Sequence, residues 1–140
     1  MSDFVHLHNH SDYSLLDAAQ TVETMCNRVS DLGMDSIAIT EHGNLFSMIP
    51  FYKAALKAGI KPILGCEMYV AVNKHTDRQL VTLETGKRRN YYHLVLLATN
   101  QQGYKNLLAL TSIGYLNGFY YRPRIDKELL EEFNEGLIAT

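Results

Sequence analysis

SIAITEHGN, residues Ser36–Asn44, places a short apolar strand directly before a polar loop. Residues 37–40 are apolar or β-branched, which is typical of a strand buried on both faces. Such strands belong to parallel sheets that are covered by helices. Because functional groups in these folds lie at the carboxyl ends of the strands, Glu41 and His42 become candidates for a functional site.

The rest of the chain alternates between strand and helix patterns around this stretch. One predicted helix has Thr21 as its N-cap and Gly33 as its C-terminal stop, and Asp126 caps another. A polar segment without clear periodicity, residues 73–89, is predicted to be a loop. The predicted strands are 4–10, 36–40, 61–64, 92–98 and 136–140; the third ends at Gly65, and residues 67–72 are predicted to be extended. The predicted helices are 22–32, 46–57, 102–113 and 127–133.

This alternation predicts an α/β fold with parallel strands and outer helices. Right-handed crossovers leave a doubly wound sheet or a barrel as the two main arrangements. Because a Gly-x-Gly-x-x-Gly motif does not follow the first strand, a dinucleotide-binding site is not supported. A complete (β/α) barrel needs about 250 residues, and the 140-residue chain ends on a strand pattern. We therefore expect residues 1–140 to form a single truncated domain, the first part of a larger barrel.

Composition narrows the classes of function. The chain is 46% hydrophobic and 20% charged, with a net charge of −2, which argues against a strongly basic nucleic-acid-binding surface. The basic run Lys87-Arg88-Arg89 is expected to lie in a solvated loop. Cys26 and Cys66 have neither the spacing of a disulfide framework nor that of a metal knuckle. No apolar run approaches the roughly 20 residues of a membrane span, so we expect a cytoplasmic protein.

HLHNH, residues 6–10, holds three of the six histidines of the chain. On a strand, alternate side chains share a face, so the three imidazoles would point the same way with Cα spacings of about 6.5–7 Å. Zinc binds imidazole nitrogens at about 2.0–2.1 Å, and two such side chains can meet on one ion. The row therefore predicts a metal site with His8 and His10 as ligands. His6 lies deeper in the predicted strand, where packing explains it equally well.

Three further segments bring candidate ligands toward the same predicted rim of the sheet. His42 follows the second predicted strand, and Glu67 follows the third. His93 is the exception, because it lies near the start of its predicted strand. Each residue alone has an ordinary explanation, as a capping group, a solvated carboxylate or a core histidine. Their joint occurrence with His8 and His10 favours a site for zinc, manganese or iron, which accept mixed histidine and carboxylate ligands.

Four short motifs occur in order along the chain: His8-x-His10-Ser11, Thr40-Glu41-His42-Gly43-Asn44, Gly65-Cys66-Glu67 and Tyr92-His93-Leu94. Together they resemble the successive motifs of the PHP (polymerase and histidinol phosphatase) domain family. Four further segments are similar to one branch of that family, the PHP domains of bacterial DNA polymerase III alpha subunits. These segments are 14–19 (SLLDAA), 51–53 (FYK), 59–62 (GIKP) and 118–126 (GFYYRPRID).

The resemblance implies a distorted seven-stranded (β/α) barrel with up to three divalent metal ions, zinc or manganese. Glu41 stands where the family usually has Asp, and the remaining ligands of the family would lie beyond Thr140. By motif position, one ion would be held by His8, His10 and Glu67, a second by Glu67 and His93, and a third by Asp17 and His42.

For function, the resemblance implies the N-terminal PHP segment of a replicative DNA-directed DNA polymerase, in which nucleotide transfer belongs to another domain. The PHP segment would hydrolyse phosphoesters with metal ions, and 3′–5′ proofreading is one form of that chemistry. Its partners would be the rest of the alpha subunit, other replisome subunits and DNA. We expect the 140-residue chain alone to be inactive, because later ligands are absent. Two alternatives stay open: a stand-alone phosphatase for a small phosphate ester, which segments 14–19 and 118–126 disfavour, and a structural module without activity.

Overall fold

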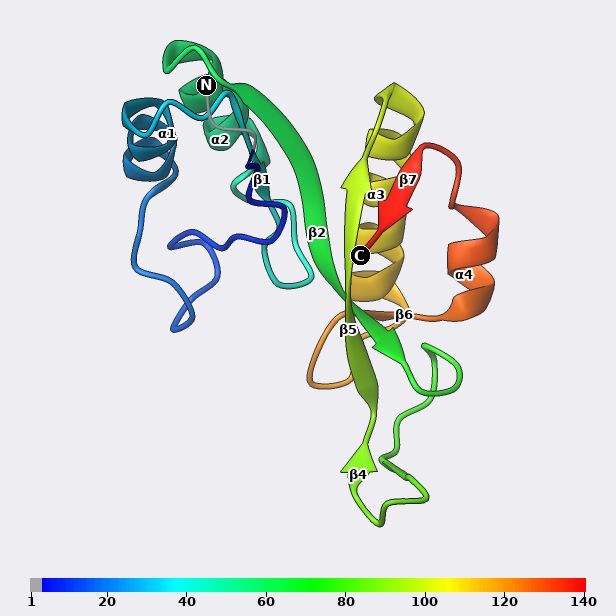
Figure 1. Ribbon diagram of the computed structural model, residues 1–140. Helices are drawn as coiled ribbons and strands as arrows, with labels where there is room; N and C mark the ends of the chain where they lie inside the picture. The colour runs from blue at the N-terminus through cyan, green and yellow to red at the C-terminus, as the bar shows by residue number, and fades with distance from the viewer. Residues whose placement is uncertain (1–3) are drawn as a thin grey trace.

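The computed structural model describes residues 4–140, which form a curved sheet with helices against it (Figure 1). No helix in this part of the chain is long and apolar enough to cross a membrane. The main sheet has the order β1 (Ser36–Ile39), β2 (Lys61–Ala71), β5 (Tyr91–Ala98), β7 (Leu137–Ala139), and β6 (Arg124–Ile125) pairs with β2. The helices are α1 (Val22–Asp31), α2 (Met48–Lys57), α3 (Gln101–Leu116) and α4 (Lys127–Glu132), and a separate ladder joins β3 (Val81–Thr82) to β4 (Arg88–Arg89).

The helices α1 and α2 pack with β1 in the first half of the fold. The helix α1 begins where Thr21 Oγ1 accepts a hydrogen bond from Thr24 N at 3.2 Å. It ends before Gly33, whose φ of +69° is the left-handed conformation that terminates many helices. Both predicted boundaries are confirmed. The fully buried residues of this core include Cys26, Ile39, Phe51 and Ala55.

The helices α3 and α4 belong to the second half of the fold. Asp126 caps α4 by accepting a hydrogen bond from Leu129 N at 3.0 Å, which confirms the predicted cap. The strand β2 belongs to both halves, because its first residues pair with β1 and its later residues with β5 and β6 (Figure 1). The second core includes Cys66, Leu107, Leu110 and Ile125.

The strands are not all parallel. The β1–β2 and β2–β6 pairs are parallel as predicted, whereas β5 is antiparallel to both β2 and β7. The prediction of parallel strands is therefore wrong for β5. Residues 72–90 join β2 to β5 without a helix, and strands joined without a crossover helix pair antiparallel. The predicted loop at 73–89 is confirmed apart from the short β3–β4 ladder.

Gly65 does not end a strand as the sequence predicted, because β2 runs unbroken through it. Gly65 pairs with Leu97 of β5. A Cβ atom at Gly65 would lie 2.6 Å from the carbonyl oxygen of Leu96. This glycine therefore permits a close approach between β2 and β5 and does not mark a break in the strand.

The histidine row at residues 6–10 lies beside β1 but does not form the predicted strand. Two backbone hydrogen bonds of 2.9 Å link the segments, from Ala38 N to His6 O and from Thr40 N to Asn9 O. The side-chain amide of Asn9 donates to His6 O at 3.2 Å and to Ala38 O at 3.1 Å. A side chain therefore replaces part of the backbone ladder, and the segment bends instead of continuing as a strand.

Candidate metal centre

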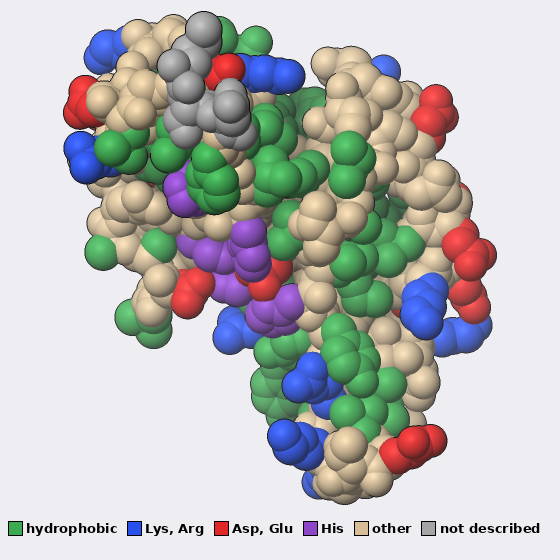
Figure 2. All heavy atoms as spheres, viewed as in Figure 1, with side chains coloured by type: hydrophobic (Ala, Val, Ile, Leu, Met, Phe, Trp, Pro, Cys, Tyr) green, Lys and Arg blue, Asp and Glu red, His purple; other side chains and the backbone are tan. Residues whose placement is uncertain are grey.

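The six predicted ligands meet at one place, where the carboxyl end of β1 lies beside the middle of β2. Figure 2 shows histidine and acidic side chains gathered together on this face. We call these six residues the metal centre, and their ligation of metal stays a prediction. Three groups have ligand atoms within 4.8 Å of one another: His8–His10–Glu67, His10–Asp17–His42 and His42–Glu67–His93.

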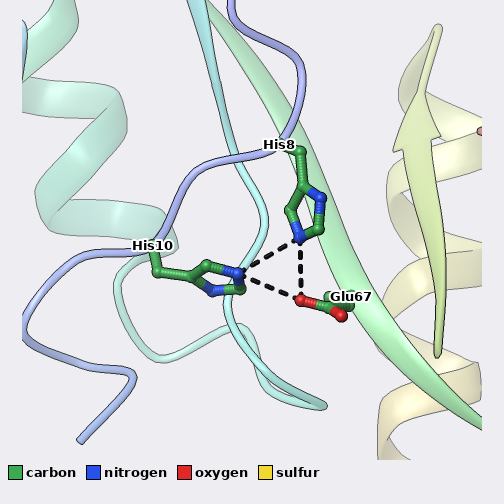
Figure 3. A group of neighbouring side chains, drawn as sticks. All are labelled: His8, His10 and Glu67. Carbon is green, nitrogen blue, oxygen red and sulfur yellow. Dashed lines mark hydrogen bonds and ion pairs between the residues drawn. The ribbon is translucent and has the colours of Figure 1, made fainter. Parts of the chain in front are cut away.

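His8, His10 and Glu67 converge from two segments (Figure 3). The Glu67 Oε2 atom lies 2.8 Å from His8 Nε2 and 3.0 Å from His10 Nε2, and the two nitrogens are 3.2 Å apart. Ligands bound to a tetrahedral ion at about 2.0–2.1 Å are separated from one another by about 3.3 Å. The spacing of the three atoms therefore fits a shared ion with little movement.

Glu67 uses both oxygens of its carboxylate. Its Oε1 atom is hydrogen-bonded to His93 Nδ1, while its Oε2 atom lies 3.3 Å from His42 Nδ1 in addition to its contacts with His8 and His10. The Glu67 side chain is 5% exposed. A buried carboxylate with imidazoles beside each oxygen is placed to bridge two ions, as carboxylates do in multinuclear hydrolytic sites.

His93 reaches the metal centre because β5 is antiparallel to β2. It pairs in register with Tyr69, two residues beyond Glu67, so the start of β5 lies beside the later part of β2. In a parallel strand, His93 would have stood at the opposite end from the other ligands. The reversed direction of β5 therefore explains the one candidate that the sequence could not place on the rim.

Asp17 lies on the outer side of the metal centre. Its Oδ2 atom is 2.8 Å from His42 Nε2 and 3.9 Å from His10 Nε2. The Ser14 hydroxyl lies 3.3 Å from His10 Nδ1 and accepts a hydrogen bond from the backbone N–H of His42 at 3.2 Å, so it holds the His10 ring and the loop that carries His42. Leu16 adopts a left-handed backbone with a φ of +68°, directly before Asp17.

The surroundings favour ionised carboxylates and a neutral imidazole. Burial opposes the ionisation of Glu67, but the hydrogen bond with His8 and the charges of nearby imidazoles outweigh it and hold its pKa below the ordinary value. The hydrogen bond with His42 lowers the pKa of Asp17. Burial, together with the neighbouring His42, lowers the pKa of His10. Because metal ligands must be deprotonated, all three shifts favour ligation.

A buried nitrogen gives an independent indication that the site fits a metal. His42 Nδ1 is buried and has no hydrogen-bond partner among the residues that the structure describes. Buried polar atoms are nearly always satisfied, and an imidazole nitrogen facing an ion is satisfied by ligation. The mixed set of imidazoles and carboxylates suits a divalent ion. The residues present therefore fit divalent metals.

Glu41, a candidate from the same loop as His42, lies behind the metal centre. Its side chain is fully buried and accepts hydrogen bonds from Ser11 N at 3.1 Å and from the hydroxyls of Ser11 and Ser14. The sequence did not indicate these two serines as positioning residues, because a serine in a loop has no diagnostic spacing. The sequence also did not indicate Tyr69, whose ring contacts His42 and His93. Tyr69 lies two residues after Glu67 and therefore on the same face of the strand.

Relatives of this chain are found among polymerase subunits. Residues 6–140 match the family model of the PHP domain. The chain is 56% identical to DNA polymerase III subunit alpha of Borreliella burgdorferi over 140 residues and 50% identical to that of Helicobacter pylori (strain 26695) over 137 residues. These alignments cover 98–99% of this chain, which spans only 11–12% of the length of these relatives.

Two solved structures share the fold. An amidohydrolase from Chromobacterium violaceum matches with a TM-score of 0.55 at 24% identity, and a protein proposed to be a metal-dependent phosphoesterase from Bifidobacterium adolescentis matches with a TM-score of 0.53 at 14% identity. Each match covers 79% of this chain and 33% of the other chain. The α/β fold class predicted from the sequence is confirmed. From its motifs, its fold and the match over residues 6–140, the chain belongs to the PHP domain family.

Proposed function

We propose that the metal centre binds divalent ions, zinc or manganese, and hydrolyses phosphoesters. The observation that carries this proposal is Glu67, a buried carboxylate with imidazoles beside both of its oxygens. The function proposed for the structural neighbour from Bifidobacterium adolescentis is of the same class.

We also propose that the chain serves as the PHP portion of a replicative DNA polymerase alpha subunit. The identity of 56% over nearly the whole chain supports this assignment. DNA, the rest of the alpha subunit and other replisome subunits would be its partners in the cytoplasm. Nucleotide transfer would belong to regions of the relatives that this chain does not span.

The residues of the metal centre have distinct tasks in this proposal. Divalent ions, when bound, supply an activated water and positive charge for the phosphoryl group. Glu67 connects the two sides of the centre, since His8 and His10 contact one oxygen and His93 contacts the other. The contact of Asp17 with His42 Nε2 orients the ring so that its Nδ1 atom faces Glu67.

Metal content tests the first step of the proposal. After incubation with zinc or manganese and dialysis, elemental analysis should find bound metal in the 140-residue chain. His10→Ala removes a nitrogen that lies 3.0 Å from Glu67 Oε2, so it should lose metal. Lys105→Ala, an exposed position on α3, is the control and should retain it. Equal metal content in the two variants would contradict the proposed centre.

Hydrolysis is tested in the complete alpha subunit that carries this sequence. Manganese- or zinc-dependent cleavage of a phosphodiester should disappear in His10→Ala, while primer extension continues. Retained metal without any hydrolysis would favour the structural module over the enzyme. Preferential cleavage of small monoesters would instead favour the phosphatase.

A further inference from the structure

Arg122 lines the same cleft as residues of the metal centre, and within residues 4–140 it has no ion pair with an acidic side chain. Its Cζ atom lies 5.8 Å from the centre of the Tyr69 ring. The same ring stacks on His42 with a centroid distance of 6.0 Å and meets the edge of His93 at 5.1 Å. The guanidinium therefore shares an aromatic neighbour with two residues of the metal centre.

A strained turn holds Arg122 in this place. Tyr121 has a φ of +61°, which is uncommon for a bulky side chain, and Tyr120 N donates to Arg122 O at 3.1 Å. Pro123 packs against the loop that carries His42, because a Cβ atom at Gly43 would lie 2.9 Å from Pro123 Cγ. Strain of this kind persists where the surrounding structure enforces it, and it clusters at ligand clamps.

Arg122 lines a cleft of about 630 Å³ together with residues of the metal centre. Among residues 4–140, no acidic side chain lies within ion-pair distance of Arg122. A guanidinium held by a cation–π contact with a tyrosine is restrained, so less freedom is lost when it binds an anion. The other residues that line the cleft with Arg122 include Asp17, His42 and His93, and the aromatic residues Tyr91, Phe119 and Tyr121.

A second group of cations lines another cavity that reaches His93. Arg88 and Arg89 of β4 line a cavity of about 490 Å³ with Tyr91 and His93. Arg89 Cζ lies 4.8 Å from the centre of the Tyr92 ring, and neither arginine has an ion pair with an acidic side chain among the described residues. Figure 2 shows Lys and Arg side chains on the projecting end of the molecule below the histidines. Arginine side chains thus line both of the cavities that reach His93.

We propose that Arg122 and the β4 arginines form a subsite for the phosphates that flank the one at the metal centre. The substrate would then be a single-stranded phosphodiester chain and not an isolated phosphate monoester. Arginine binds phosphate oxygens in a bidentate fashion, and the tyrosine and phenylalanine rings of the cleft offer stacking surfaces for bases. This inference rests on the proposed phosphoesterase function, because it assigns the substrate class of the same site.

Binding measurements test the subsite without requiring hydrolysis. Fluorescence anisotropy of a labelled thymidine tetranucleotide should be measured with the 140-residue chain in chelator and in manganese, over a range of salt concentrations. Arg122→Gln should weaken binding about tenfold and reduce the slope of log K against log salt by about 0.7, the value for one phosphate contact on a single strand. Arg89→Gln should reduce the slope by a similar amount. Arg122→Lys, which keeps the positive charge, should have the slope of the wild type.

The controls separate this inference from the proposed function. Lys105→Gln removes one exposed charge on α3 and should leave the slope unchanged. His10→Ala should abolish manganese-dependent binding of inorganic phosphate. In the His10→Ala background, Arg122→Gln should still reduce the slope of log K against log salt for the tetranucleotide. A slope in Arg122→Gln equal to that in Lys105→Gln would overturn the subsite. If Arg122→Gln weakened the binding of the tetranucleotide and of inorganic phosphate equally, the subsite would also be overturned, because Arg122 would then bind a single phosphate.

Discussion

Two buried carboxylates of this chain are paired with histidine, and their surroundings differ. Asp126 accepts hydrogen bonds from His75 Nδ1 at 2.5 Å, from His75 N at 2.9 Å and from Leu129 N at 3.0 Å. The contacts of the Glu67 carboxylate are with imidazole rings from three separate segments. Asp126 is satisfied by two backbone amides and one imidazole, and Glu67 is surrounded by potential metal ligands.

The difference shows when a histidine–carboxylate pair indicates a metal. Beside Asp126, the buried guanidinium of Arg124 donates to His75 O at 3.0 Å and to Gly118 O at 3.1 Å. This network ties residues 72–90 to the start of α4, and its role is structural. Beside Glu67, His42 Nδ1 lies 3.3 Å from Glu67 Oε2 but has no hydrogen-bond partner among the described residues. Converging imidazoles with an unsatisfied nitrogen distinguish the metal centre from the structural pair.

Glu67→Gln should give the largest effect. The substitution keeps the size of the side chain but removes the charge that two ions would share. Loss of hydrogen-bond partners of metal ligands alone weakens metal affinity 10–100-fold, so loss of a bridging ligand should weaken it by at least about 100-fold. Isothermal titration with zinc or manganese measures this change. If the metal affinity of Glu67→Gln were unaltered, Glu67 would not differ from Asp126 in metal binding.

Asp126→Asn should give the opposite pattern, with lower stability and unchanged metal affinity. Hydrogen bonds to a charged group contribute about 1.5–3 kcal/mol, so we expect a loss of about 2 kcal/mol in the free energy of unfolding by urea. Glu128→Gln on the same helix is the control. Glu128 is 75% exposed and pairs with Lys74 at 3.6 Å, so its loss should change stability by less than about 0.5 kcal/mol. Lower metal affinity in Asp126→Asn would mean that the two networks are coupled.

The pH dependence of stability should show the smallest effect. Burial raises the pKa of Asp126, but the hydrogen bonds from His75 and Leu129 outweigh it and hold the pKa below its ordinary value. The stabilisation is therefore complete above the unfolded-state pKa of about 3.9 and is lost as the pH falls through the native pKa. The stability difference between the wild type and Asp126→Asn should shrink from pH 7 to pH 3 in urea titrations. A constant difference would show that the charge of Asp126 does not contribute.

Local features of the sequence were sufficient for several helix ends, although α3 continues to Leu116, three residues beyond its predicted end. Thr21, Gly33 and Asp126 mark helix ends through hydrogen bonds or dihedral angles that involve residues at most four positions away. Such signals depend on the near sequence, and the structure confirms them. Gly65 was misread for the opposite reason, because its role is a contact with β5, about thirty residues away in the chain.

The types of residue in the metal centre could be read from the sequence, because imidazole and carboxylate groups after predicted strands are unusual without a ligand. The tertiary structure alone decided how they meet. The antiparallel direction of β5 brings His93 to Glu67. His8 and His10 meet Glu67, whereas His6 is in none of the three groups of neighbouring ligand atoms. The buried Glu41 accepts hydrogen bonds from Ser11 and Ser14 and does not join the metal centre. Strand direction and burial depend on contacts between distant segments, which no local pattern of residues records.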